Sequence, residues 1–177
     1  HGRQMAELPL HPRLAHMLLQ AVPLQLGTLA CTLAALLSER DILRGSLGQR
    51  NADLRLRVDV LRGQHDHATG ETIDPAACRR VTRTADLWQR QFLRSTRSNQ
   101  HENLDAVGRV LALAYPDRIA QRQRGTDARY LMANGRGALF VNPDPLGSED
   151  YLVIADLDGG AQWARIDLAA PVQLSDV

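Results

Sequence analysis

The feature that most constrains the fold is a change in the spacing of apolar residues along this 177-residue chain. Up to Pro116 the apolar residues recur every three or four positions, which is the spacing of amphipathic helices. After Gly125 two short runs rich in strand-forming residues flank Asn134-Gly135, the strongest short signal for a β-hairpin. A second pair of such runs turns at 158–160. Helices followed by strands predict an α+β chain, with a helical bundle preceding a small antiparallel β unit.

Local signals place several helix ends. Pro12 suits the first turn of a helix, and a strong apolar stripe runs from Leu26 to Leu37. Asp74-Pro75 combines a capping residue with a proline at the first helical position, so we expect a longer helix to begin there. Tyr115 precedes a proline, which disfavours the helical backbone conformation, and the last helix should therefore end at this residue.

The basic residues are unusual in kind. All 21 of them are arginines, and the chain contains no lysine. A phosphate-binding loop of the Walker type ends in Gly-Lys-Ser/Thr, and Schiff-base chemistry needs a lysine amine. The sequence therefore excludes both from this chain.

The charges are also segregated along the sequence, although the net charge is only +1. Residues 75–136 hold twelve arginines and five acidic residues, a net charge of +7. Residues 137–177 hold one arginine and seven acidic residues, a net charge of −6. This asymmetry indicates a surface that faces a polyanion in the middle segment.

The helix that begins at Asp74-Pro75 carries a line of arginines. At 100° per residue these arginines gather within about 60° of one another, roughly opposite the apolar positions, and Asp86 interrupts them. Guanidinium groups make bidentate contacts with phosphate, so this face is a candidate for binding RNA. The alternative is a solvated face, or one that docks against an acidic domain. The candidates are Arg79, Arg83, Arg90 and Arg94, with Arg97 at the end of the line.

Two other motifs raise the possibility of a metal site and of a disulfide, but neither is favoured by the sequence. His65-Asp66-His67 has ligand-like spacing without a third or fourth partner, and a polar loop explains it better than a metal site. Cys31 and Cys78 lie far apart in helical patterns, which favours buried thiols in a reducing compartment over a disulfide. No nucleophile elbow is present. We therefore predict no catalytic residue and no metal site.

The chain carries no sign of membrane insertion or export. No apolar run approaches the roughly 18 residues of a membrane span. The opening residues show no charged region leading into an apolar one, so no signal peptide is predicted. The chain begins with His rather than Met, which we interpret as an excised piece of a longer protein. We expect a cytoplasmic location and no membrane partner.

Six stretches, in this order, resemble the HrpB-type bacterial ATP-dependent helicases of the DEAH/RHA group. The similarity spans nearly the whole chain, and its most specific part is LAYPDRIA followed by ANGRGA. The stretches are MAELPLHPRLAHMLL, CTLAALLSERD, ADLRLRVDVL, VGRVLALAYPDRIAQRQ, RYLMANGRGA and YLVIADLDG.

The resemblance implies a domain order. In that family two RecA-like motor domains are followed by a winged helix, a helical ratchet-like helicase-associated domain and an OB-like barrel. By this resemblance residues 1–8 end the winged helix and 9–115 form the helical domain. A linker is expected over 116–127, and an OB-like β unit, which the chain need not contain in full, over 128–177.

A second group of arginines lies at and beyond the expected join. OB-type barrels often bind single strands, so these arginines are further candidates, and a flexible charged linker is the alternative. They are Arg118, Arg122, Arg124 and Arg136. Few aromatic side chains are available to stack on bases, and some must belong to the core, so we do not expect stacking to dominate. The available ones are Tyr130, Phe140, Tyr151 and Trp163.

The resemblance also implies a function. The family's ATP-binding loop, its Asp-Glu-Ala/Gly-His box and its arginine finger cannot be matched here, so the chain alone should not hydrolyse ATP. ATP and Mg²⁺ belong to the motor domains of the parent protein, and no cofactor is expected in this chain. The predicted role is to guide single-stranded nucleic acid, with RNA favoured over DNA, beside the RecA-like domains of the same polypeptide. The alternative is a protein-interaction or scaffolding module without nucleic-acid contact.

Overall fold

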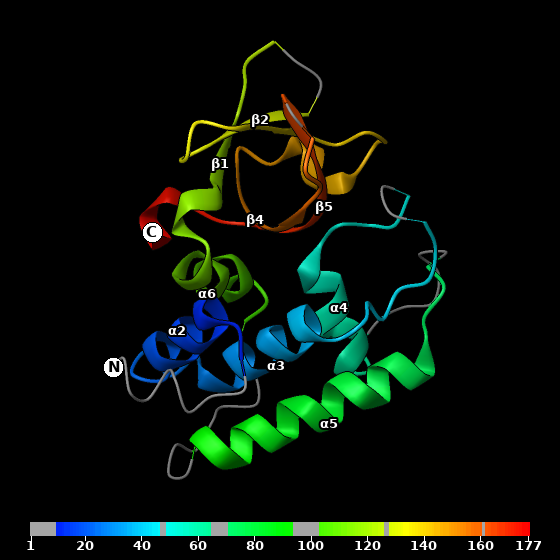
Figure 1. Cartoon of the computed structure of the whole chain (residues 1–177), viewed down its shortest axis with the longest axis vertical. Coiled ribbons are helices and arrows are strands. Elements are labelled where there is room, and N and C mark those ends of the chain that lie inside the picture. The colour runs from blue at the N-terminus through cyan, green and yellow to red at the C-terminus, as the bar shows by residue number, and fades with distance from the viewer. Residues whose placement is uncertain (1–9, 47–48, 65–70, 94–102, 126–127, 161) are drawn as a thin grey trace.

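The computed structural model describes residues 10–46, 49–64, 71–93, 103–125, 128–160 and 162–177. A helical unit lies at one end of the molecule and a β-barrel at the other (Figure 1). This arrangement confirms the predicted α+β class, with helices preceding strands. The expected end of a winged helix, residues 1–8, lies outside the described residues.

Apolar patterning builds the helical unit around α3, which is buried along most of its length. The long helix α5 packs on α3, while α2 packs against α3 and α6. The predicted start of α5 is confirmed, because the Asp74 carboxylate accepts hydrogen bonds from the amides of Ala76 and Ala77. The helices are α2 (Pro12–Ala21), α3 (Gly27–Ser38), α4 (Leu54–Leu61), α5 (Pro75–Phe92) and α6 (Ala106–Ala114).

The strands form a closed barrel in the order β1-β2-β3-β5-β4, an OB-like topology. Both predicted hairpins are present, and Gly135 at the first turn has a φ of +84°, which glycine adopts readily. Neighbouring strands are antiparallel except for β3 and β5, which run parallel. The strands are β1 (Ile119–Arg122), β2 (Arg129–Met132), β3 (Gly137–Leu139), β4 (Tyr151–Leu157) and β5 (Trp163–Pro171).

The structure differs from the expected linker over 116–127. Residues 119–122 already form the strand that closes the barrel, paired with both β2 and β4. Only Ala120 is fully buried, whereas Gln121 and Arg122 are exposed, so this short segment lacks the apolar alternation that would identify a strand.

The barrel and the helical unit share one hydrophobic core. Val153, Ala155, Ala170 and Val172 point outward from β4 and the end of β5 and pack among the helix side chains. Gly108 of α6 lies so close to β5 that a Cβ added there would be 1.9 Å from the backbone oxygen of Pro171. The barrel is therefore packed directly against the helices.

A buried arginine fixes α4 within the helical unit. The side chain of Arg57 is only 2% exposed, and its Nε and Nη2 donate to the two carboxylate oxygens of Asp41 at 2.9 and 2.8 Å. Its Nη1 donates to the backbone oxygens of Asn51 and Asp53 at 2.8 and 3.0 Å. These polar contacts of the buried charge come from the segment just before α4 and from Asp41, which follows α3.

Candidate nucleic-acid interface

The arginine line of α5 lies on the outer side of the molecule. Val81, Ala85 and Trp88 are buried against the rest of the helical unit, and α5 forms the edge farthest from the barrel (Figure 1). The described arginines of the line are exposed, and no ion pair between described residues involves them. These are Arg79, Arg83 and Arg90, whereas Arg94 and Arg97 lie outside the described residues.

This face is not purely basic. Leu87 is 56% exposed, and Asp86 beside it is exposed as well. Arg90 donates from Nε to the backbone oxygen of Asp86 at 3.2 Å, which leaves most of its guanidinium donors directed to solvent. The face can therefore bind an anion through its arginines, and it also presents one large apolar side chain.

Arg118 occupies a different environment at the join of the two units. It is half-buried, its Cζ lies 5.1 Å from the centre of the Tyr115 ring, and its Nη1 donates to the backbone oxygen of Ala155 at 2.9 Å. Arg13 lies over the same ring and forms an ion pair with Asp117. Arg13, near the start of α2, therefore contacts the end of α6 and the short turn at 116–118 that leads into β1.

The ion pair at this join is partly open to solvent. The hydrogen bond from Arg13 is the main reason that the pKa of the Asp117 carboxyl is lowered, and the charges of Arg13 and Arg118 act in the same direction. Each of the Arg13 and Asp117 side chains is 38% exposed. Solvent screening therefore makes this pair a modest contributor to stability.

Arg122 and Arg124 border a polar cleft on the barrel with a volume of about 530 Å³. Arg122 lies 3.7 Å from the carboxylate of Asp150, which is itself 80% exposed. Tyr151 borders the same cleft, where its hydroxyl accepts a hydrogen bond from Gln121 at 3.2 Å. The cleft combines two arginines, amide groups, one aromatic side chain and the Asp150 carboxylate. The arginines can bind a phosphate, and Asp150 offsets part of their charge.

The predicted aromatic candidates have unequal access to solvent. Tyr130 is fully buried and its hydroxyl lies 2.8 Å from the backbone oxygens of Leu146 and Glu149. Burial raises the pKa of Tyr130 to about 12, and Phe140 packs edge-on against its ring. Tyr151 is half-buried, whereas Trp163 is 39% exposed. Two of the four aromatic candidates therefore belong to the barrel core.

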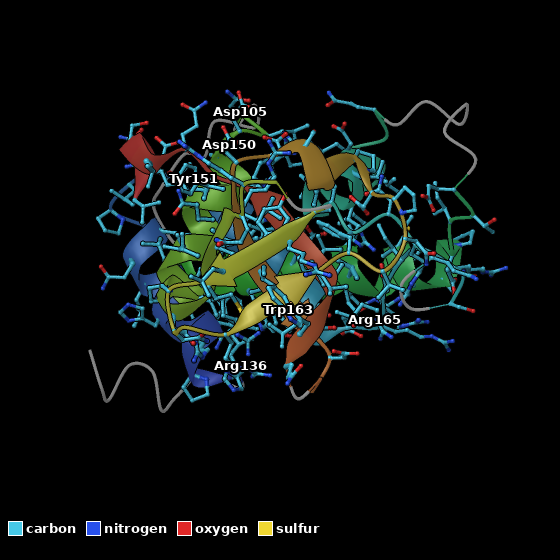
Figure 2. The ribbon with its side chains drawn as sticks, turned by 90° about the horizontal axis from the view of Figure 1, so that it is seen from above. Asp105, Arg136, Asp150, Tyr151, Trp163 and Arg165 are labelled. Atoms are coloured by element: carbon cyan, nitrogen blue, oxygen red, sulfur yellow. The ribbon has the colours of Figure 1, made fainter. Side chains whose placement is uncertain are left out.

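The candidate binding residues predicted from the sequence lie in separate parts of the structure. The α5 arginines and the barrel arginines lie at opposite ends of the molecule (Figure 1). On the barrel, Arg136 and Trp163 lie on one side, and Tyr151 and Asp150 lie on the other (Figure 2). The basic segment 75–136 is therefore not one continuous surface.

One neighbouring pair is not foreseen from the sequence. The guanidinium of Arg129 lies over Trp163, with its Cζ 5.2 Å from the ring centroid. Trp163 alone appears among the sequence candidates. The pairing arises because β3 brings β2 and β5 together, and the parallel contact between β3 and β5 has no local sequence signal.

The remaining chemical motifs add no site within the described part of the chain. The residues described hold no group of three His, Cys, Asp or Glu side chains that could bind a metal ion, and 65–67 lie outside them. Cys31 and Cys78 are not joined by a disulfide. No described helix is long and apolar enough to cross a bilayer.

The chain therefore consists of a helical unit packed on a closed OB-like barrel, the architecture that the sequence resemblance implies. Over 99% of its length it is 32% identical to the ATP-dependent RNA helicase HrpB of Escherichia coli K12. These findings confirm the resemblance to the C-terminal region of HrpB helicases. No family model matches the sequence.

Solved structures give the same relation. The crystal structure of the E. coli DExH-box NTPase HrpB has a TM-score of 0.70 and 30% identity, over 99% of this chain. A crystal structure of the E. coli DEAH/RHA helicase HrpB has a TM-score of 0.70 and 28% identity, over 98% of this chain. In each case the chain spans 19% of the length of the relative.

Proposed function

We propose that this chain is the non-catalytic, nucleic-acid-guiding region of an HrpB-type ATP-dependent helicase in the cytoplasm. The observation that carries the proposal is the outer face of α5, where three exposed arginines have no ion-pair partner among the described residues. In this proposal ATP and Mg²⁺ bind the RecA-like motor domains, and this chain holds the strand as the motor moves it. RNA is the favoured strand because the relative is named an RNA helicase.

The geometry of α5 suits contacts with a sugar-phosphate backbone. Arg79 and Arg83 are one helical turn apart, and Arg90 extends the line to roughly 16 Å along the helix axis. Exposed guanidinium groups bind phosphate oxygens without reading the bases, and binding releases counterions from the nucleic acid. The cleft at Arg122 and Arg124 supplies a second basic contact on the barrel.

A second function has one observation in its favour. Leu87 is 56% exposed beside the arginines of α5, and an apolar side chain among basic ones suits a protein interface. In this alternative the α5 face docks against an acidic surface of the motor or of another protein. The chain is then a scaffold that does not touch nucleic acid.

Reversing the charge of Arg79 and Arg83 distinguishes these functions. We expect Arg79→Glu with Arg83→Glu to weaken single-stranded RNA binding roughly ten- to thirtyfold near 0.1 M salt. The loss of two phosphate contacts should also flatten the slope of log K against log salt by about 1.4. Fluorescence anisotropy of a labelled RNA, measured at several salt concentrations, gives both quantities.

The matched control is Arg40→Glu with Arg109→Glu, which makes the same change in charge at two exposed arginines off this face. The control should lose much less affinity, because it alters only the long-range field. If both double variants lost the same affinity, the loss would be due to the change in net charge and not to contacts made by Arg79 and Arg83. A folded α5 variant with unchanged affinity, together with a protein partner that is retained after nuclease treatment, would favour the scaffold.

A further inference from the structure

The outer surface of β2, β3 and β5 presents an exposed indole. The strand registers place Leu131 opposite Gly137, and Gly137 opposite Trp163, so these three residues form one row across three strands. The neighbouring residues Tyr130, Ala138 and Ala164 are buried, and side chains alternate along a strand, so this row points outward. Leu131 is 46% exposed and Trp163 is 39% exposed.

Gly137 allows the indole to lie over the sheet. A Cβ added to Gly137 would be 2.5 Å from Cε3 and 2.7 Å from Cζ3 of Trp163, so the six-membered part of the indole rests on this glycine. A larger residue at this position would displace the ring. The indole is therefore held in a fixed place on the barrel surface.

Three arginines lie near the indole, and two of them form no ion pair with a described residue. Arg129 lies over the ring, and Arg136 donates to the backbone oxygen of Gly160 at 3.3 Å, in the loop before β5. Neither forms an ion pair with a described residue. Arg165 also lies nearby, but Asp167 at 2.7 Å and Asp158 at 3.7 Å engage its charge. Figure 2 shows Trp163, Arg136 and Arg165 on the same side of the barrel.

We propose that Trp163 is a base-stacking site for single-stranded nucleic acid, and that Arg129 and Arg136 hold the neighbouring phosphates. This site rests on the proposed function, and it adds a contact with the bases that the arginines of α5 do not provide. Gly137 lies under the ring and Arg129 lies over it, so a base stacks on the indole when the Arg129 guanidinium moves from the ring to a neighbouring phosphate. A flat apolar ring with arginines beside it complements a nucleotide, which joins a flat base to an anion. Trp and Arg are also enriched at protein interfaces, so a protein partner for this surface is the alternative that the experiment must exclude.

Two tryptophans with different exposure make the site testable. Trp88 is 5% exposed in the helical unit, so quenching of the intrinsic fluorescence by a bound strand reports mainly on Trp163. Labelled single-stranded RNA of mixed sequence gives the affinity by anisotropy in the same titration. Trp163→Ala should weaken binding about five- to 150-fold, the range found when a stacking aromatic is replaced by alanine.

The salt dependence and the controls separate stacking from charge. Trp163→Ala should leave the slope of log K against log salt unchanged, because the indole carries no charge. Trp163→Phe should keep most of the affinity, and Leu174→Ala, at another exposed apolar side chain, should keep all of it. An RNA with several adjacent abasic positions should bind the wild type and Trp163→Ala about equally.

The outcomes distinguish this site from the proposed function. If the wild-type chain binds RNA, but Trp163→Ala binds equally well and the wild type shows no quenching, the stacking site is wrong and the proposed function stands. If the wild-type chain binds no RNA at low salt, both fail, and a protein surface is the better assignment for the exposed indole. Circular dichroism and thermal unfolding confirm that each variant is folded.

Discussion

Replacing Arg57 by methionine is expected to lower the free energy of unfolding by about 3–5 kcal/mol, because it leaves the buried Asp41 carboxylate without its main partner. Both carboxylate oxygens of Asp41 accept hydrogen bonds from Arg57, and the Asp41 side chain is only 13% exposed. Arg50, 3.1 Å away, supplies part of the lost charge but cannot replace the bonds to the backbone oxygens. Urea or guanidinium unfolding, followed by circular dichroism, measures the change.

The Arg57–Asp41 pair also makes the free energy of unfolding depend on pH. Burial opposes the charge of Asp41, but the hydrogen bonds and charge of Arg57, the backbone amide of Leu43 and the charge of Arg50 together outweigh it and lower the pKa of Asp41 below its ordinary value. The unfolded chain therefore takes up a proton at higher pH than the folded chain. The contribution of Asp41 is fully present above the pKa of an unfolded aspartate, about 3.9, and is lost as the pH falls through the lower folded value.

Two variants control this prediction. Arg44 makes a looser ion pair with Asp74, at 3.7 Å, and its side chain is 59% exposed. Arg44→Met should therefore cost below about 1 kcal/mol. Arg57→Met combined with Asp41→Leu should recover part of the loss, because the buried carboxylate is then absent and Arg50 keeps its hydrogen bond to the backbone oxygen of Leu43. Equal stability of Arg57→Met and the wild type would contradict the buried pair.

Replacing Gly108 by alanine is expected to destabilise the chain by about 3 kcal/mol, at the upper end of the usual cost of overpacking. The added methyl would lie 1.9 Å from the backbone oxygen of Pro171, so α6 and β5 would have to move apart. In an exposed helix the same change stabilises by about 1 kcal/mol, so the sign of the effect is itself informative.

Hydrogen exchange shows where the Gly108→Ala variant loosens. Faster exchange should appear in α6 and at the end of β5, where the barrel meets the helices. Gly159→Ala is the control, because a Cβ there meets nothing within 4 Å, and it should be close to neutral. A stabilised Gly108→Ala variant would mean that the barrel does not pack on α6 as described.

The features that could be predicted from the sequence are those set by the spacing of apolar residues and by local capping and turn residues. The start of α5 follows from Asp74-Pro75, and the exposed line of Arg79 and Arg83 follows from helical spacing. The first hairpin follows from Asn134-Gly135. Each of these features depends on residues that are close in the chain.

The remaining features depend on contacts between distant residues. The strand at 119–122 has no apolar alternation, and its partners lie in β2 and β4. Arg13 pairs with Asp117, which lies more than a hundred positions further along the chain. Trp163 of β5 contacts Arg129 of β2 because β3 lies between these two strands and pairs with both. The separation of the α5 arginines from the barrel arginines likewise follows from tertiary packing, which a count of charges along the chain cannot reveal.

The central claim is that this chain holds single-stranded nucleic acid, and the most direct test is RNA binding by the wild-type chain as a function of salt. Anisotropy of a labelled single-stranded RNA should show saturable binding at low salt. The value of log K should fall linearly with log salt, with a slope of about −0.7 for each phosphate contact. No binding at low salt, or binding that does not change with salt, would contradict the claim and assign the arginine face of α5 to docking against another protein domain.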